Sequence, residues 1–271
     1  MFKTRLLSGI LLVILIVAVL YFGGYVTAGA MLFVSLVGVF ELLRVYGIEK
    51  KPIGFVAYAA TVAHYAVLML GREDLILPVA LGMLLLVLAV YVITYPTYTD
   101  KDALAAVFAF FYAGMLLSYI YMIRKMPDGG ALVVMVFVCS WVNDTLAYCA
   151  GVTLGKHKMS PKLSPKKSVE GLIGGLLGST IVGALYGVFF NAYVTELSLA
   201  PVIFGAAGLL GAAVAVIGDL AASAIKRNND IKDYGKLIPG HGGVLDRFDS
   251  ILFTAPIVYY TFLYTIGHLG G

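Results

Sequence analysis

The chain has 271 residues, of which 61% are hydrophobic and 13% are charged, and its mean hydropathy is +0.96. A soluble globular domain is about 45–50% apolar and about 25% charged, so this composition excludes an ordinary soluble domain. The formal net charge is +4, but in so apolar a chain the position of the basic residues is more informative than their total. The sequence therefore predicts an integral membrane protein, with no nucleic-acid partner.

Nine apolar stretches approach or exceed the length of about 20 residues that a helix needs to cross a bilayer. Helices are expected because a lipid-exposed segment must satisfy its own backbone hydrogen bonds, and runs such as LLVILIVAVL lack the alternation of barrel strands. The predicted fold class is an all-α, polytopic membrane helix bundle with about nine transmembrane helices. The predicted spans are residues 6–22, 26–46, 53–70, 75–95, 103–123, 131–154, 171–193, 199–225 and 250–268.

The first apolar stretch resembles a secretory signal, because Lys3 and Arg5 precede it and a small-residue sequence follows at 28–30. It reaches spanning length, however, and a second apolar stretch follows at once. We therefore expect a retained first helix.

The basic residues predict the orientation of these spans. If the N-terminus is cytoplasmic, sixteen of the 19 Lys and Arg residues lie on the cytoplasmic side, and Arg72, Arg124 and Lys125 lie on the other. Basic residues concentrate in cytoplasmic connections, so the N-terminus is predicted to be cytoplasmic and the C-terminus external. The loops 155–170 and 226–249 are then cytoplasmic, at the face of the cytoplasmic (inner) membrane.

The two parts of the chain differ in polarity. Residues 1–130 are predicted to be scaffold helices, in which Glu41 and His64 are the conspicuous ionisable residues and His64 is expected to be a hydrogen-bonded packing residue. Residues 131–271 carry the intramembrane acids and both long basic loops, so this part is predicted to be the catalytic region. Cys139 and Cys149 are expected to be packing residues.

Glycines at positions 171, 174, 175 and 178 form overlapping pairs of small residues, and a second small-residue face lies at 206–211. Such faces predict close helix packing, either within one subunit or between the subunits of a homodimer.

Two carboxylates lie inside apolar stretches. An unpaired acid costs several kcal/mol there, so an acid at such a position indicates a functional site. Asp144 lies in SWVNDTLAYCAG, directly after Asn143, and Asp219 lies in AVAVIGDLAASAIKRNND. On a helix, Asp219 shares one face with Ser223, Lys226 and Arg227. A carboxylate, a hydroxyl and two cations on one face are suited to a metal ion beside a phosphate; a structural Asp144 and a snorkelling helix end are the simpler alternatives.

The stretch KRNNDIKDYGKLIPGHGGVLDRFDS, residues 226–250, is the most polar in the chain, with nine charged side chains. Asp246 and Asp249 are three residues apart where the last span begins, and grouped carboxylates suit Mg2+ completed by substrate phosphates. Arg247 can offer a fork to phosphate oxygens. Glycines 240, 242 and 243 flank His241 and predict a turn whose backbone N–H groups approach an anion.

The second polar loop, GKHKMSPKLSPKKSVEG, holds five lysines. Lys156, Lys158 and Lys162 can equally bind anionic lipid headgroups, which contribute about 1 kcal/mol for each basic residue. Lys166 and Lys167 directly precede a predicted helix N-terminus, where anions are favoured, and they are better candidates for a phosphate contact.

The spacing of these residues is similar to that of a known family. Residues 223–249, from Ser-Ala-Ile-Lys-Arg to Asp246-Arg247-Phe248-Asp249, resemble the signature of the CDP-diacylglycerol synthases (phosphatidate cytidylyltransferases) without a departure. The blocks Asp144-Thr-x-Ala-Tyr and Ser164-Pro-Lys-Lys-Ser-x-Glu-Gly171 are also similar to that family. The N-terminal spans are similar only as generic apolar helices. The resemblance implies the reaction of CTP with phosphatidate to CDP-diacylglycerol and pyrophosphate, dependent on Mg2+, with membrane lipids as surroundings.

The residues and the resemblance together predict one site. Its catalytic residues are expected to be Asp144, Asp219, Lys226, Arg227, Asp246 and Arg247. Its substrate contacts are expected to be Asn143, Lys166, Lys167, Ser223, Lys232, Asp233, His241, Gly242 and Gly243. Its metal ligands are expected to be Asp144, Asp219, Asp246 and Asp249, with Mn2+ as a substitute for Mg2+ and room for a second cation.

Two other classes of protein are consistent with parts of this pattern. An ion-coupled transporter would use Asp144 and Asp219 as intramembrane coupling sites, but no second half of the chain repeats the first. A lipid kinase of the polyprenol or dolichol type would share a nucleotide and a lipid substrate. The spacing of Lys232 and Asp233 favours the cytidylyltransferase.

Overall fold

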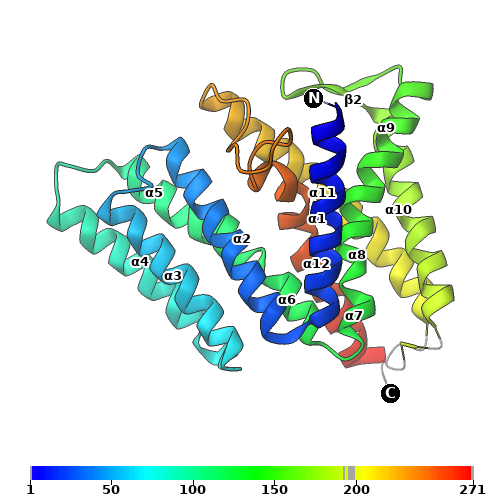
Figure 1. The fold of residues 1–271 in the computed structure, drawn as a ribbon, viewed down its shortest axis with the longest axis horizontal. Coiled ribbons are helices and arrows are strands. Elements are labelled where there is room, and N and C mark those ends of the chain that lie inside the picture. Colours follow the sequence, from blue (N-terminus) through cyan, green and yellow to red (C-terminus); the bar gives the residue numbers. More distant parts are fainter. Residues whose placement is uncertain (1, 192, 195–198, 270–271) are drawn as a thin grey trace. The chain divides into compact units, whose positions relative to one another are not determined.

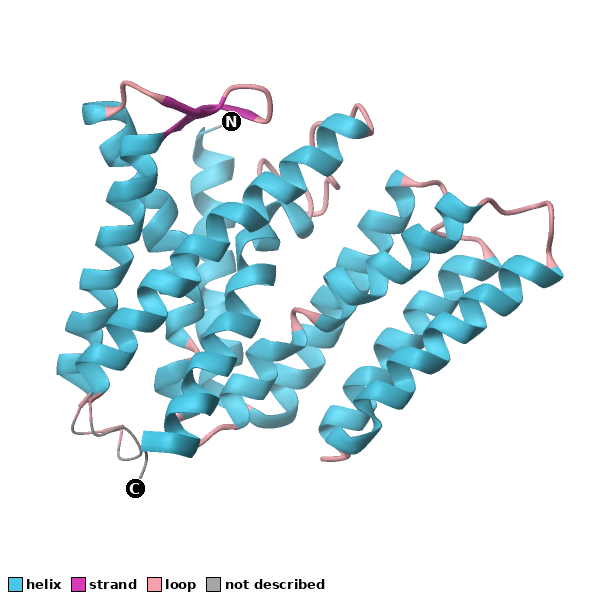
Figure 2. Ribbon diagram, turned by 180° about the vertical axis from the view of Figure 1, so that it is seen from behind, coloured by secondary structure: helices cyan, strands magenta, loops and turns pink. Residues whose placement is uncertain are grey.

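The computed structural model describes residues 2–191, 193–194 and 199–269 and consists almost entirely of helices (Figures 1 and 2). The chain divides into two compact units, one formed by Met1–Tyr121 with Asp233–Arg247 and the other by Met122–Lys232 with Phe248–Gly271. The segment 233–247 therefore packs with helices that lie far before it in the sequence. The predicted division of roles at residue 130 stays a prediction.

The first unit is built from long apolar helices joined by short turns. Its elements are α1 (Phe2–Phe22), α2 (Gly24–Val45), α3 (Pro52–Met69), η1 (Glu73–Leu75), α4 (Ile76–Ile93), α5 (Asp100–Ala109), the π-helical η2 (Phe110–Met115) and the start of α6 (Ser118–Lys125). Thr99 begins α5 with a capping box, since its side chain and that of Asp102 each accept from the other's backbone N–H. His64 is buried and lies 2.9 Å from Ser118 Oγ, which confirms its predicted packing role.

The second unit holds the loop 155–170 and the helices that carry Asp144 and Asp219. Its helical elements are α7 (Gly129–Leu132), α8 (Val134–Phe137), the π-helical η3 (Val138–Val142), α9 (Asn143–Leu154), α10 (Val169–Phe190), α11 (Ala200–Asn228) and most of α12 (Leu245–Leu269). Cys139 is buried and donates to Ala207 O, whereas Cys149 is exposed, and both thiols are free. The predicted packing role therefore holds for Cys139 and not for Cys149.

The helices coincide with the predicted apolar stretches. Among the described residues, seven helical stretches are long and apolar enough to cross a membrane, from Gly24–Val45 to Ala200–Asn228. The apolar part of α1, Leu6–Phe22, is shorter than these seven. The protein is thus an all-α, polytopic membrane protein, and a total of nine spans remains a prediction.

The loop 155–170 contains a small hairpin that the sequence analysis did not anticipate. Strands β1 (Lys158–Ser160) and β2 (Ser164–Ser168) pair with each other in antiparallel orientation. Both strands are polar and β2 contains a proline, so the alternation that normally identifies a strand is missing. The hairpin leads directly into α10, where Ser168 Oγ caps the helix by accepting from Gly171 N at 3.1 Å.

Small residues let α10 pack closely on both neighbours in its unit. Every fourth residue of its buried stripe is small: Gly171, Gly175, Ser179, Gly183 and Gly187. A Cβ on Gly171 would lie 2.7 Å from Ala147 O of α9, and one on Gly187 would lie 2.8 Å from Ala200 O of α11. The predicted close packing is therefore formed within the chain.

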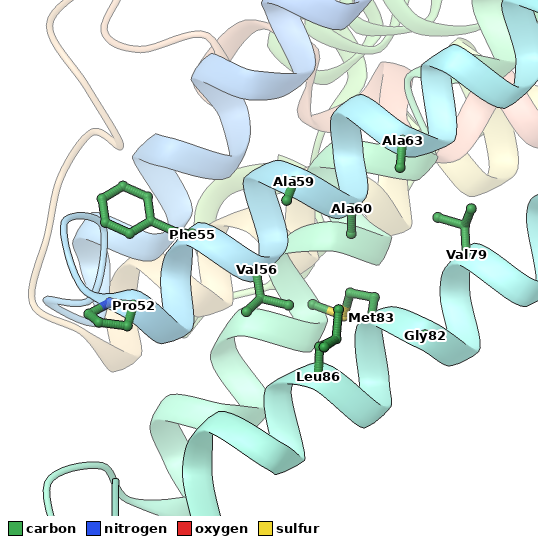
Figure 3. Close-up of a pocket in the computed structure, with 10 residues that line it drawn as sticks. All are labelled: Pro52, Phe55, Val56, Ala59, Ala60, Ala63, Val79, Gly82, Met83 and Leu86. Atoms are coloured by element: carbon green, nitrogen blue, oxygen red, sulfur yellow. The ribbon is translucent and has the colours of Figure 1, made fainter. Parts of the chain in front are cut away.

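An apolar groove of about 500 Å³ lies between α3 and α4 (Figure 3). Val56 and Ala60 of α3 face Met83 and Leu86 of α4, and the lining carries no charged side chain. A nucleotide triphosphate needs cationic partners, so this groove is not the predicted site.

Candidate active site

Two of the predicted acids meet where α11 packs against α12. Asp219 follows Gly218 on α11, and a Cβ on Gly218 would lie 2.6 Å from the backbone oxygen of Asp249. The absence of a side chain at Gly218 therefore permits the close helix contact that brings Asp219 toward Asp249. The Asp249 carboxylate interacts electrostatically with Asp219, Lys226 and Asp144. Its Oδ1 accepts from Ser250 N at 2.8 Å.

Lys167 brings the basic hairpin to the same acids. The Lys167 ammonium forms an ion pair with the Asp219 carboxylate, and the two side chains are 25% and 27% exposed. Lys166, its neighbour on β2, is exposed, as expected for successive residues of a strand. The start of the hairpin is held by Glu170, which accepts from Lys156 N at 3.1 Å and lies 2.6 Å from His157 Nδ1.

Asn143 and Asp144 begin α9 directly after the π-helical η3. Wide turns of this kind are frequent at functional sites. Asp144 is exposed and interacts electrostatically with Asp249. Asn143 is only 1% exposed, and a Cβ on Gly175 of α10 would clash with its side-chain oxygen. Its amide has no hydrogen-bond partner among the described residues.

Asp246 has a different environment, in the first unit. It is 8% exposed, and its Oδ2 accepts from Tyr234 N at 2.8 Å and from Gly243 N at 2.9 Å. Residues 233–244, which we call the glycine loop, are thus folded back on the first turn of α12. Gly242 has φ +86°, and a Cβ there would lie 2.8 Å from Asp246 Oδ2, so glycine is required for both reasons.

The turn around His241 is already internally bonded. Ile238 N donates to Gly242 O at 3.0 Å, and His241 N donates to Ile238 O at 2.9 Å. The Arg247 Nε donates to His241 O at 2.9 Å while the side chain stays exposed. His241 Nδ1 lies 2.9 Å from Ser8 Oγ of α1. The N–H groups of His241 and Gly243 are thus already hydrogen-bonded, to Ile238 O and to Asp246 Oδ2. Fewer backbone N–H groups of this turn therefore remain for the predicted contact with an anion.

The remaining predicted residues lie at the end of α11 and just beyond it. Asp219, Ser223 and Lys226 follow one another along this helix at the predicted spacing and are half-buried. Arg227, Lys232 and Asp233 are exposed. The helix ends as Ile231 N donates to Lys226 O at 3.0 Å and Asp230 adopts a left-handed φ of 51°. The basic residues are therefore carried at the polar end of an otherwise apolar helix.

The structure also identifies residues that the sequence analysis did not assign. Glu41 of α2 is 2% exposed and accepts from Val244 N at 3.0 Å and from Leu245 N at 2.9 Å. Arg44, one turn later, donates to the backbone oxygen of Tyr234. A buried acid near a helix end was the available signal, but its partners lie about 200 residues away in the sequence.

The acids fit a hard cation by their chemistry. Mg2+ takes oxygen ligands and is usually held by one or two carboxylates together with substrate phosphates. Asp219 and Asp249 supply such a pair, with Asp144 in electrostatic range of Asp249. Within the described residues, no three His, Cys, Asp or Glu side chains form a ready-made metal site. The arrangement therefore suits a cation completed by substrate rather than a closed protein cage.

The fold and this site define a polytopic helical membrane protein that gathers carboxylates and lysines at helix ends. The family model of the cytidylyltransferases matches residues 3–265, and the chain belongs to this family.

Similar proteins extend over nearly the whole chain. It is 32% identical over 264 residues to the phosphatidate cytidylyltransferase of Staphylococcus saprophyticus, covering 94% of this chain and 97% of that protein. It is 30% identical over 267 residues to the phosphatidate cytidylyltransferase of Bacillus subtilis, with 95% and 96% covered. The enzyme of the same name from Synechocystis sp. is 30% identical over 290 residues, with 94% of each covered.

Proposed function

We propose that the protein transfers the cytidylyl group of CTP to phosphatidate and forms CDP-diacylglycerol and pyrophosphate. The observation that carries this proposal is the meeting of Asp219, Asp249 and Lys167 at the polar ends of apolar helices, in a chain of this family. A lipid phosphate can reach such helix ends from the bilayer, and a nucleotide can reach them from water.

The phosphate of phosphatidate already carries its nucleophilic oxygen as an anion, so the reaction needs no strong general base. The oxygen attacks the α-phosphorus of CTP, a P–O bond forms, and the bond to the departing pyrophosphate breaks. The protein must hold two anionic groups together and neutralise the charge that develops between them. Lys226 and Arg227 at the end of α11, with Arg247 and Lys167, are assigned to these phosphates.

Asp219, Asp249 and Asp144 of the second unit are assigned as the carboxylates that would hold Mg2+, for which Mn2+ can substitute. Asp246 keeps the metal role that its motif predicts. A bound divalent cation would supply charge neutralisation at the phosphates. The ion pair between Lys167 and Asp219 keeps a cation beside one of these carboxylates, where it can also contact a substrate phosphate.

Purified protein is expected to release pyrophosphate when CTP and phosphatidate are both present, and with no other nucleoside triphosphate. The measurement is pyrophosphate release with each nucleotide, together with chromatography of the labelled lipid product. Formation of a nucleoside diphosphate with a newly phosphorylated lipid would instead identify a kinase. The ion-coupled transporter has no support from the family match, which covers residues 3–265.

The site is proposed to lie at the cytoplasmic face of the inner membrane, because CTP is present in the cytoplasm. In a Cys149→Ala background, cysteines placed at the exposed Lys162 and Lys236 should react with a membrane-impermeant thiol reagent only after the cytoplasmic face is opened. A cysteine at Lys125 should react from outside. The loop position Thr195, also predicted to be external, lies outside the described residues. Labelling of Lys125 and Lys162 in the reverse order would refute the orientation.

A homodimer remains a further prediction. The glycine faces that suggested it pack α10 against α9 and α11 within the chain, so a dimer requires another surface.

A further inference from the structure

Glu41 of α2 lies among the scaffold helices, yet its partners belong to the glycine loop and the start of α12. Its two oxygens accept separately, Oε1 from Val244 N at 3.0 Å and Oε2 from Leu245 N at 2.9 Å. These N–H groups lie at the first turn of α12, where a helix has unsatisfied donors and favours negative charge. Glu41 thus acts as a helix cap supplied by a distant segment of the same compact unit.

The loop is shaped to fit around this carboxylate. A Cβ on Gly235 or on Gly243 would clash with Glu41 Oε1, so both positions accept only glycine while Glu41 is in place. Arg44 holds the other side of the loop through the backbone oxygen of Tyr234. Helix α2 therefore binds the loop at two places, through the side chains of Glu41 and Arg44, which carry opposite charges.

The same loop is bound a second time by Asp246. This acid accepts from Tyr234 N at 2.8 Å and from Gly243 N at 2.9 Å, so Glu41 and Asp246 bind adjacent backbone groups from two directions. Because Gly243, Val244 and Leu245 are consecutive, a shift of one anchor displaces the other. Asp246 and Arg247 lie directly after these residues.

We infer that Glu41 is a positioning residue of the active site, which sets the placement of Asp246 and Arg247 by anchoring the glycine loop to α2. Glu41 acts through the loop and contacts no substrate itself. The inference rests on the proposed function in one respect, namely that Asp246 and Arg247 serve catalysis.

The test compares Glu41→Gln with the unchanged full-length protein. Glutamine keeps the shape but turns one acceptor into an N–H2 donor, which then faces a backbone N–H donor. Trypsin cleavage after the exposed Lys236 of the loop should accelerate on the order of tenfold, relative to cleavage after Lys162 in the hairpin. The kcat/KM for CTP should fall on the order of tenfold or more.

Ser35→Ala is the matched control. Ser35 is a fully buried polar residue on the same helix, and its Oγ lies 2.8 Å from Tyr65 Oη of α3. It should lower the melting temperature without changing the Lys236 cleavage ratio or the KM for CTP. Unchanged cleavage at Lys236 in Glu41→Gln, or a kinetic loss no larger than that of Ser35→Ala, would overturn the inference. If Glu41→Gln accelerates cleavage at Lys236 but the unchanged protein does not use CTP, the proposed function is refuted and the anchoring of the loop by Glu41 is retained.

Discussion

Asp246→Asn is expected to lower the turnover number on the order of 10² or more, the largest loss of any acid in the site. The carboxylate is 8% exposed and binds Tyr234 N and Gly243 N through Oδ2. An amide oxygen can replace Oδ2 in those bonds, so the loop can persist while the negative charge is lost. The measurement is kcat from pyrophosphate release with CTP and phosphatidate, beside a melting curve in detergent.

Asp230→Asn is the control for this change, because it removes one charge from the same polar stretch. Asp230 is exposed and has φ 51°, a left-handed conformation that asparagine adopts readily. It should keep nearly the full rate and stability. Equal and mild losses at Asp230 and Asp246 would mean that the stretch is only a charged surface.

Asp249→Asn is expected to reduce the rate on the order of tenfold or more at low Mg2+, with partial recovery at high Mg2+ or with Mn2+. Asp249 interacts with Asp219, Asp144 and Lys226, so its loss weakens the oxygen set proposed for the cation. The measurement is the rate as a function of each metal concentration, with the apparent metal affinity as the second readout.

Asp100→Asn is the matched control for the metal titration, since Asp100 is an exposed acid in the first turn of α5. Its metal dependence should equal that of the unchanged protein. A rate that stays low for Asp249→Asn at every metal concentration would contradict a ligand role and assign the acid to the reacting phosphates.

The agreement between sequence and structure is best where a local pattern carried the information. Helices follow apolar stretches because the backbone must satisfy its hydrogen bonds within each span, and this requirement is local. The face of Asp219, Ser223 and Lys226 on α11 follows from helical spacing alone. The β1–β2 hairpin was missed because its polar strands carry no alternation.

The environments of the acids could not be predicted in the same way. Asp246 and Asp249 are three residues apart and looked equivalent, yet Asp246 binds the glycine loop whereas Asp249 interacts with Asp219 and Asp144. Which partner a carboxylate finds depends on which helix packs beside it. Gly218 decides this for Asp249, since a side chain there would keep α11 away from α12.

The sequence by itself determined that this is a helical membrane protein, what family it resembles, and which charged residues are concentrated in its last half. Composition, span length and motif spacing carry that information because each is a property of the chain before it folds. Only the tertiary structure decided that Lys167 pairs with Asp219 and that Glu41 caps α12 from 203 and 204 residues away. Contacts of this range arise when distant helices pack, so no local pattern in the chain encodes them.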